Sequence, residues 1–270
     1  MEDSDDKGTV REFWDKRARD NNVDASRVTH PDVWQRWIEI ELLKQYLDPQ
    51  ADVLEVGCGN GYTTAHVAPL VRSVVAVDYS EAMVARARED CQDVRTRSGV
   101  SPDFRVGDAL RLSADDLGQF DLVISQRCLI NLQSWDDQKE ALRRIAAVTK
   151  PGGRFIMMEG SAQGRRMLDE ARGSMGLERM PRVWHNVDFE IEQTKEFLSP
   201  YFELVHEQTL GTYDFVSRLV HPLLAAPEAP QYEAEINRIA AELTMKLSLE
   251  HNGFAELGRL FFWVLERRAS

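Results

Sequence analysis

The chain has 270 residues, 43% of them apolar, so it can bury the core of one elaborated domain or of two small ones. Its 45 acidic side chains outnumber its 33 lysines and arginines, which leaves a formal net charge of -12. Because such a charge repels phosphate-rich molecules at long range, the composition disfavours a nucleic-acid partner.

The cysteines and the N-terminal residues indicate a compartment. Cys58, Cys91 and Cys128 form no Cys-x-x-Cys pair, which favours free thiols in a reducing environment. The opening residues, MEDSDDKGTV, are acidic where a signal peptide is basic and then apolar, and no apolar run approaches the ~20 residues of a membrane helix. We therefore expect a cytoplasmic protein with no membrane partner. The sequence leaves its oligomeric state open.

Two amphipathic helices are expected in residues 1–50, within VREFWDKRARDN (10–21) and DVWQRWIEIELLKQYL (32–47). We expect them to lie across the ligand edge of a sheet as a lid. Trp14 and Trp37 would then supply apolar cover, and Arg17 and Arg36 could reach an anionic group of a bound molecule.

Strands alternate with helices from about residue 50 onward. Apolar runs predict strands at 51–56, 73–80, 104–109, 120–126 and 153–160, and helical spacing predicts helices within 81–97 and 134–150. Such a series folds as a parallel sheet with right-handed crossovers and helices on both faces.

The alternation changes after residue 160. YFELVHEQTL (201–210) and GRLFFWVLERR (258–268) read as two closing strands, and a proline-punctuated, helix-rich stretch separates them. The expected domains are therefore an N-terminal helical lid (1–50), a sheet domain (51–210 and 258–270) and a helical insertion (211–257). Tyr213, Phe215 and Arg218 of the insertion are expected to close over the site.

Three glycines follow the first strand in LEVGCGNG (54–61). A strand that enters a helix through such a turn presents backbone N–H groups, and glycine lets a ligand approach where a Cβ would collide. The alternative is a tight turn with no ligand. The nicotinamide fingerprint fits poorly, because its third glycine position holds Tyr62 and the extra glycine is Gly61.

Four landmarks occur in a fixed order: the glycine turn with Glu55 two residues before Gly57, Asp78 ending VAVDYS, VGDA after the third strand, and VTKPGG before the fifth. Over about residues 51–160 the sequence resembles a class I S-adenosylmethionine-dependent methyltransferase. The resemblance implies a Rossmann-like fold, with a doubly wound, mostly parallel seven-stranded sheet. It also implies S-adenosylmethionine as cofactor and S-adenosylhomocysteine as product.

The resemblance also implies roles for individual residues. The glycine turn would lie under the methionine moiety, Asp78 would take both ribose hydroxyls, and Asp108 would meet the adenine amino group. Asp78 can instead cap the following helix, Met83 can be core, and Arg127 can be solvated. The full expected cofactor set comprises Trp14, Arg17, Arg36, Glu55, Gly57, Cys58, Gly59, Asp78, Tyr79, Met83, Gly107, Asp108, Ala109, Gln126 and Arg127.

Methyl transfer depends chiefly on alignment and desolvation, and a general base is optional. His185, in the loop sequence WHN, is the first candidate base, followed by Glu159 and Tyr213; His185 can equally close its loop by hydrogen bonding. The six histidines show no pair at metal-ligand spacing, so no metal is expected.

The expected acceptor is an O or N atom of a small or medium-sized metabolite, such as a natural product or sugar. SQRCLIN, after the fourth strand, lacks the Asn/Asp-Pro-Pro-aromatic motif of the family members that methylate adenines in nucleic acid. Two alternatives stay open: a noncatalytic S-adenosylmethionine-binding scaffold, and a Rossmann-type oxidoreductase with a nucleotide cofactor.

Overall fold

The computed structural model describes residues 8–20, 22–247 and 254–269. Its central feature is a seven-stranded sheet with the order β3-β2-β1-β4-β5-β7-β6. Neighbouring strands from β3 to β5 are parallel, whereas β7 runs antiparallel to both β5 and β6. The strands are β1 (Asp52–Val56), β2 (Ser73–Asp78), β3 (Asp103–Val106), β4 (Phe120–Gln126), β5 (Thr149–Gly160), β6 (Phe202–Thr209) and β7 (Leu260–Arg267).

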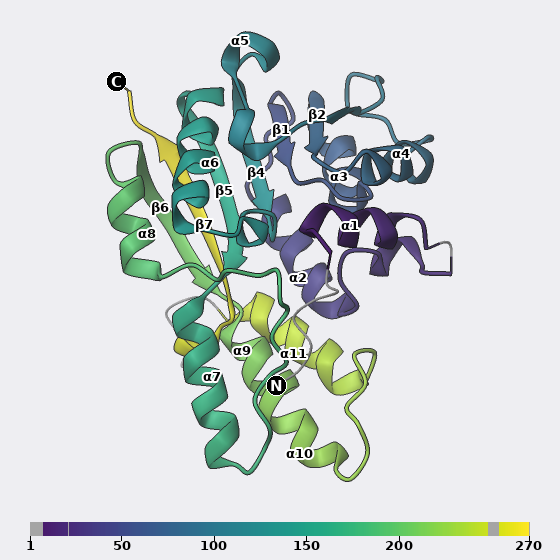
Figure 1. Ribbon diagram of the computed structural model, residues 1–270, viewed down its shortest axis with the longest axis vertical. Coiled ribbons are helices and arrows are strands. Elements are labelled where there is room, and N and C mark those ends of the chain that lie inside the picture. The colour runs from purple at the N-terminus through teal and green to yellow at the C-terminus, as the bar shows by residue number, and fades with distance from the viewer. Residues whose placement is uncertain (1–7, 21, 248–253, 270) are drawn as a thin grey trace.

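Helices cover both faces of the sheet and extend beyond its carboxyl edge. In Figure 1 the sheet occupies the upper half, α7, α9, α10 and α11 gather below it, and α1 and α2 lie between the two parts. The helices are α1 (Val10–Ala18), α2 (Val33–Lys44), α3 (Tyr62–Val67), α4 (Glu81–Asp90), α5 (Ala114–Leu117), α6 (Trp135–Val148), α7 (Ala162–Ser174), α8 (Ile191–Leu198), α9 (Gly211–Asp214), α10 (His221–Ala225) and α11 (Glu235–Lys246), with a π-helix at Phe215–Val220.

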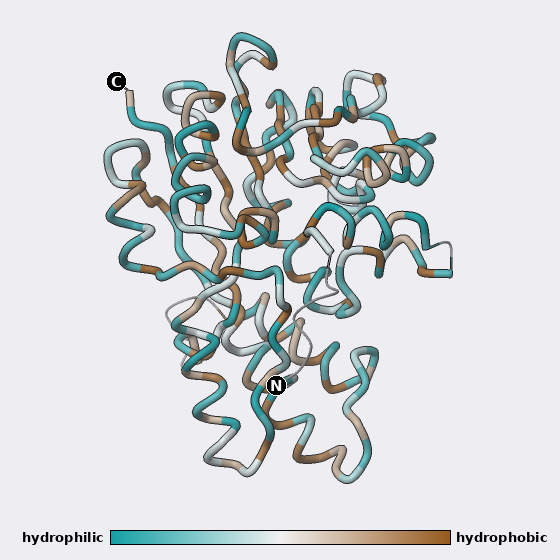
Figure 2. Tube along the Cα trace, viewed as in Figure 1, coloured by the Kyte–Doolittle hydropathy of each residue, from teal (hydrophilic) through white to brown (hydrophobic). Residues whose placement is uncertain are grey.

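The strands are apolar on both faces because each face meets its own layer of helices. Successive residues of β5 alternate between the two layers: Phe155 packs with the core beneath α6, and Ile156 packs with the core beneath α2. Figure 2 shows hydrophobic and hydrophilic segments alternating along the surrounding helices, as amphipathic cover requires. The predicted fold class is confirmed.

Local sequence signals explain where several helices begin. Thr9 and Glu12 form a capping box at α1, and the side chain of Asp32 accepts a hydrogen bond from the N–H of Gln35 at the start of α2. Helix α1 packs on α4, and α2 packs on α3 and α11. Both N-terminal helices therefore lie against the sheet domain, and α2 also lies against the helices between β6 and β7.

Within the described ranges, no helix combines the length and the apolar character that crossing a bilayer requires. All three cysteines are free thiols.

Candidate active site

A cavity of about 820 Å³ lies at the carboxyl edge of the sheet. Strand β1 is flanked by β2 on one side and β4 on the other, so the chain order reverses between β1 and β4. Helices leave the sheet in opposite directions at such a switch point and open a crevice between them. The cavity is built from the loops that follow β1 to β5, from α1 and α2, and from the loop before β7.

The glycine turn forms the floor of this cavity. Gly57, Gly59 and Gly61 all have positive φ values, of +77°, +54° and +76°. A Cβ on Gly57 would lie 2.3 Å from Sγ of Cys128, so the turn has no room for a side chain there. The N–H groups of Gly57 and Cys58 both donate to the carbonyl of Val77, which fixes the turn against the end of β2.

Asp78 lies beside the turn at the end of β2 and lines the cavity. Its Oδ2 accepts a hydrogen bond from the N–H of Gly59 and its Oδ1 accepts one from the N–H of Ser80, both at 2.9 Å. Burial raises its pKa, although these two hydrogen bonds oppose that effect. A carboxylate has about four acceptor positions, so Asp78 keeps capacity for ligand hydroxyls. Ser80, not Asp78, caps α4.

The residues that follow β2 and β3 line the same end of the cavity. Tyr79, Met83, Gly107, Asp108 and Ala109 all contribute to its wall. Met83 is also fully buried against Ala18 and Val28, so it is both core and lining. Oδ1 of Asp108 accepts the N–H of Leu110 at 2.9 Å, which holds this carboxylate at the edge of the sheet.

Glu55 and Cys58 lie beneath the turn with almost no solvent exposure. The hydroxyl of Thr64 donates to Oε2 of Glu55 at 2.5 Å. Burial raises the pKa of Glu55 to about 7, and burial also raises the pKa of the Cys58 thiol well above its ordinary value. Both side chains are therefore uncharged over part of the neutral pH range.

The N-terminal helices supply one wall. The indole N–H of Trp14 donates to Oδ1 of Asn131 at 2.9 Å, and Arg17 donates to the carbonyls of Arg27 and Val28. Both side chains line the cavity. Trp37 has 36% of its surface exposed and is not part of the wall that the described residues form.

Arg36 is a buried cation on the cavity wall, with 3% of its surface exposed. Its Nη1 donates to the carbonyl of Ser26 and to the hydroxyl of Thr29, and its guanidinium lies 4.0 Å from the centre of the Tyr62 ring. Among the described residues no carboxylate lies within ion-pair distance of it, and its Nε has no hydrogen-bond partner. Burial lowers its pKa to about 10.

Gln126 ends β4 and Arg127 follows it, and both side chains line the cavity. Arg127 has a left-handed backbone with φ of +51°, and its Nη2 lies 3.3 Å from Oε2 of Glu39. Gln126 accepts a hydrogen bond from Thr63 and donates one to the same carboxylate. Glu39 is completely buried in α2 and thus holds both side chains in place. Sequence reasoning missed Glu39, because an acidic residue inside an amphipathic helix carries no signal of burial.

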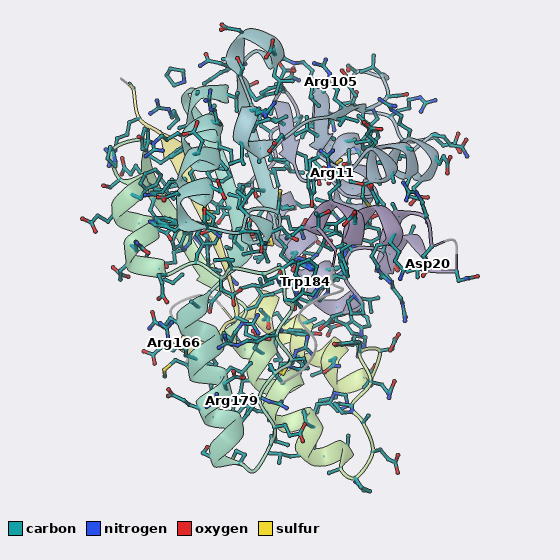
Figure 3. All side chains as sticks on the ribbon, viewed as in Figure 1. Arg11, Asp20, Arg105, Arg166, Arg179 and Trp184 are labelled. Carbon is teal, nitrogen blue, oxygen red and sulfur yellow. The ribbon has the colours of Figure 1, made fainter. Side chains whose placement is uncertain are left out.

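His185 is the expected base that the structure places on the cavity wall. Its ring centre lies 4.5 Å from that of Phe13, 5.5 Å from that of Trp14 and 5.1 Å from that of Trp184. Burial lowers its pKa, so the imidazole is neutral near pH 7. Figure 3 shows Trp184 where the sheet-bearing half meets the helical half, with Arg11 nearer the sheet.

The structure places Glu159 and Tyr213 away from the wall that the described residues form. Glu159 is fully buried and accepts hydrogen bonds from the hydroxyl of Ser125 and from the N–H groups of residues 128–130. The phenol of Tyr213 donates to Oδ1 of Asp32 at 2.7 Å. Glu159 therefore fixes the loop after β4, and Tyr213 joins α9 to the start of α2. Phe215 and Arg218 also lie off the cavity wall: Phe215 stacks on Phe254, and Arg218 pairs with Asp32.

The half of the cavity beyond β4 contains residues that sequence reasoning did not single out. We call this half the acceptor chamber, after the acceptor that the sequence leads us to expect; its walls include residues from the segments 13–14, 30–35, 127–133, 160–165, 180–188, 232 and 259–260. His30, Arg165, Asp188 and Arg259 give it polar groups, and Arg165 Nε donates to Asp188 Oδ2 at 2.6 Å. No local motif marks these residues, because the fold brings them together from distant segments.

Comparison with known proteins shows which families and proteins this chain is similar to. A family profile described as a methyltransferase domain matches residues 53–153. A ubiquinone biosynthesis O-methyltransferase from Xanthomonas axonopodis pv. citri is 33% identical over 121 residues, which cover 44% of this chain and 48% of that protein. A demethylmenaquinone methyltransferase from Symbiobacterium thermophilum is 32% identical over 169 residues, which cover 59% and 62%. The chain thus spans about half to three fifths of these relatives' length.

Solved structures share the fold at lower identity. The N-methyltransferase NodS from Bradyrhizobium japonicum, in complex with S-adenosylhomocysteine, aligns with a TM-score of 0.57 and 13% identity over 97% of this chain and all of that chain. The [4+2]-cyclase SpnF aligns with a TM-score of 0.56 and 18% identity over 92% of this chain and 86% of that chain. Since such low identity shows the fold alone, the family assignment depends on the sequence matches together with the four landmarks. Residues 53–153 thus match a methyltransferase domain, and over this region the chain is similar to the class I S-adenosylmethionine-dependent methyltransferases, whose cofactor is S-adenosylmethionine.

Proposed function

We propose that the protein transfers a methyl group from S-adenosylmethionine to an O or N atom of a small or medium-sized metabolite. The observation that carries the proposal is one continuous cavity with two different ends. Its β1–β3 end has the glycine turn, Asp78 and Asp108, and its other end is the acceptor chamber. The names of the two relatives, which refer to ubiquinone biosynthesis and to demethylmenaquinone, support a small organic acceptor.

The residues of the β1–β3 end fit the cofactor. Asp78 offers acceptor capacity for two hydroxyls, and Gly57 and Gly59 line the cavity without side chains. Arg36 is a buried cation without a carboxylate partner among the described residues, so it suits the α-carboxylate of the methionine moiety. When bound, S-adenosylmethionine supplies an electrophilic methyl group on a sulfonium.

The chain's own contribution is to orient the acceptor and to exclude water. Phe13 and Trp14 cover the chamber from the N-terminal side, and Tyr232 reaches it from the insertion. We assign a lid role to α1, α2 and the 211–257 insertion on this basis. His185 is neutral and lines the chamber, which supports it as our candidate to take a proton from an acceptor hydroxyl.

Titration calorimetry with S-adenosylhomocysteine, followed by mass spectrometry of reactions with S-adenosylmethionine and a panel of hydroxylated and aminated small molecules, tests the proposal. We expect cofactor-product binding and at least one acceptor that gains the mass of a methylene group. A protein that binds S-adenosylhomocysteine but methylates nothing would be a noncatalytic scaffold. A protein that binds neither S-adenosyl compound would overturn the proposal at its first step.

A further inference from the structure

The charges of the acceptor chamber are internally paired. Arg165 pairs with Asp188 at 2.6 Å, and Arg259 pairs with the buried Asp214 at 2.9 Å. Arg127 contacts Glu39, as described above. An ionic acceptor would bring another desolvated charge into a region whose guanidinium groups already have carboxylates, and such a charge is costly unless it gains its own partner. This pairing favours an uncharged acceptor.

One wall of the chamber is aromatic. The rings of Phe13 and Trp14 lie edge to face, with centres 5.0 Å apart, and both contact the imidazole of His185. These three rings come from α1 and from the 183–187 loop, and all three side chains line the cavity. Edge-to-face and offset contacts between aromatic rings contribute beyond the area that they bury, so this wall suits an aromatic acceptor.

The side chain of His30 lines the same chamber. The N–H of Asp32 donates to its Nδ1 at 3.2 Å, and this backbone donor cannot rotate away. This contact favours the neutral tautomer in which Nδ1 is unprotonated and Nε2 carries the proton. Nε2 of His30 also lies 3.5 Å from Nε2 of Gln35. This distance is too long for a strong hydrogen bond, so the contact with the N–H of Asp32 is the better guide to the tautomer.

The Nε2–H of His30 has no protein acceptor among the described residues. The amide nitrogen of Gln35 already donates to Glu39 at 2.9 Å, so it faces His30 as a donor. Burial lowers the pKa of His30 well below its ordinary value, and the guanidinium groups of Arg127, Arg36, Arg218 and Arg259 lower it further. His30 therefore stays neutral and keeps a single N–H to offer to a bound molecule.

We infer that the acceptor is an uncharged, aromatic molecule with a hydrogen-bond-accepting oxygen, which packs against the Phe13–Trp14–His185 wall and accepts a hydrogen bond from Nε2 of His30. The inference rests on the proposed function, since it describes the acceptor of that site. It makes His30 a specificity-determining residue that sequence reasoning did not identify.

Three matched probes test the inference in the presence of saturating S-adenosylhomocysteine: 2-naphthol, naphthalene and 2-naphthoate, titrated by fluorescence. We expect 2-naphthol to bind about tenfold more tightly than naphthalene, because it adds one hydrogen bond. We expect 2-naphthoate to bind more weakly than 2-naphthol, because its carboxylate is desolvated without a free cation.

The variants isolate the contribution of His30. His30→Ala should abolish the preference for 2-naphthol over naphthalene and leave the affinity for S-adenosylhomocysteine unchanged. His30→Gln should restore the preference, because a glutamine amide nitrogen reaches the position of Nε2. His66→Ala, which changes a histidine on α3 outside the chamber wall, should keep the wild-type preference.

Three results would overturn the inference: a preference that survives His30→Ala, 2-naphthoate binding at least as tightly as 2-naphthol, or no probe binding up to its solubility limit. Each can occur while S-adenosylhomocysteine still binds, and then the proposed function stands. Failure of S-adenosylhomocysteine to bind, with the probes still bound, would instead remove the proposed function.

Discussion

The N–H of Gly59 donates to Oδ2 of Asp78 at 2.9 Å. This hydrogen bond joins two parts of the cavity lining, the turn after β1 and the end of β2. Asp78 therefore fixes the conformation of the glycine turn, and its remaining acceptor positions are those that we propose for a ligand. A change at Asp78 should affect both functions.

Asp78→Ala should lower the affinity for S-adenosylhomocysteine by about 100-fold or more, since hydrogen bonds to a charged group contribute about 1.5 to 3 kcal/mol each. Titration calorimetry measures this loss, and circular dichroism checks that the variant is folded. Asp103→Ala is the matched control, because it removes a carboxylate from the amino end of the neighbouring strand β3. A folded Asp78→Ala protein with wild-type affinity would remove Asp78 from the binding site.

Gly59→Ala should cost more stability than Gly176→Ala. Both glycines have positive φ, of +54° and +74°, so both changes carry a left-handed penalty of about 1 to 2 kcal/mol. A Cβ on Gly59 would also lie 2.7 Å from Cγ2 of Thr29, whereas nothing lies within 4 Å of one on Gly176. Urea unfolding measures both losses. Only Gly59→Ala should also weaken S-adenosylhomocysteine binding; equal behaviour of the two variants would show that the turn is an ordinary one.

The strands were predictable because buried parallel strands are continuous apolar runs. The expected strand at 51–56 is observed at Asp52–Val56, and the expected end of the fifth strand at residue 160 is observed. Helix α7 was not predicted. It contains two glycines and few apolar residues, and tertiary packing selects it: a Cβ on Gly164 would lie 1.8 Å from the carbonyl oxygen of Gly258.

The sequence predicted the candidate site correctly for residues that end or directly follow a predicted strand. Gly57, Asp78 and Asp108 each follow or end a strand, and all three line the cavity. Glu159 also lies near a strand end, but alternation along β5 turns its side chain into the core. Tyr213 donates to Asp32, which is 181 residues away in sequence. A local sequence pattern cannot predict such a long-range contact.

Asp32→Ala should destabilise the protein by about 3 to 5 kcal/mol, because it leaves the guanidinium of Arg218 buried without this partner. Asp32 has no exposed surface and also accepts the phenol of Tyr213, so α2 and the insertion both depend on it. Urea unfolding at constant pH measures the loss. Glu190→Gln breaks the exposed pair with Arg166, in which both side chains are more than half exposed, and should cost at most about 1 kcal/mol. Similar losses in the two variants would contradict the assignment of the buried pair.

Glu55→Gln should change how stability depends on pH. Burial raises the pKa of Glu55 to about 7 in the folded protein, above the value of about 4.3 expected for the unfolded chain. A raised carboxyl pKa means that the folded state holds its proton more tightly. The stabilisation is therefore complete below about pH 4.3 and is lost as the pH rises through 7.

The difference between the two proteins isolates this effect, because the equally buried Glu159 titrates in both. From pH 4.5 to pH 7.5 the free energy of unfolding of the wild type should fall relative to that of Glu55→Gln by an amount on the order of 3 kcal/mol, and the difference should then stay constant. Glutamine keeps an amide oxygen for the hydroxyl of Thr64, so the substitution preserves that hydrogen bond while removing the ionisation. Urea unfolding across this range, without added S-adenosyl compounds, measures the difference. A difference that is independent of pH would show that Glu55 titrates in the folded protein as it does in the unfolded chain.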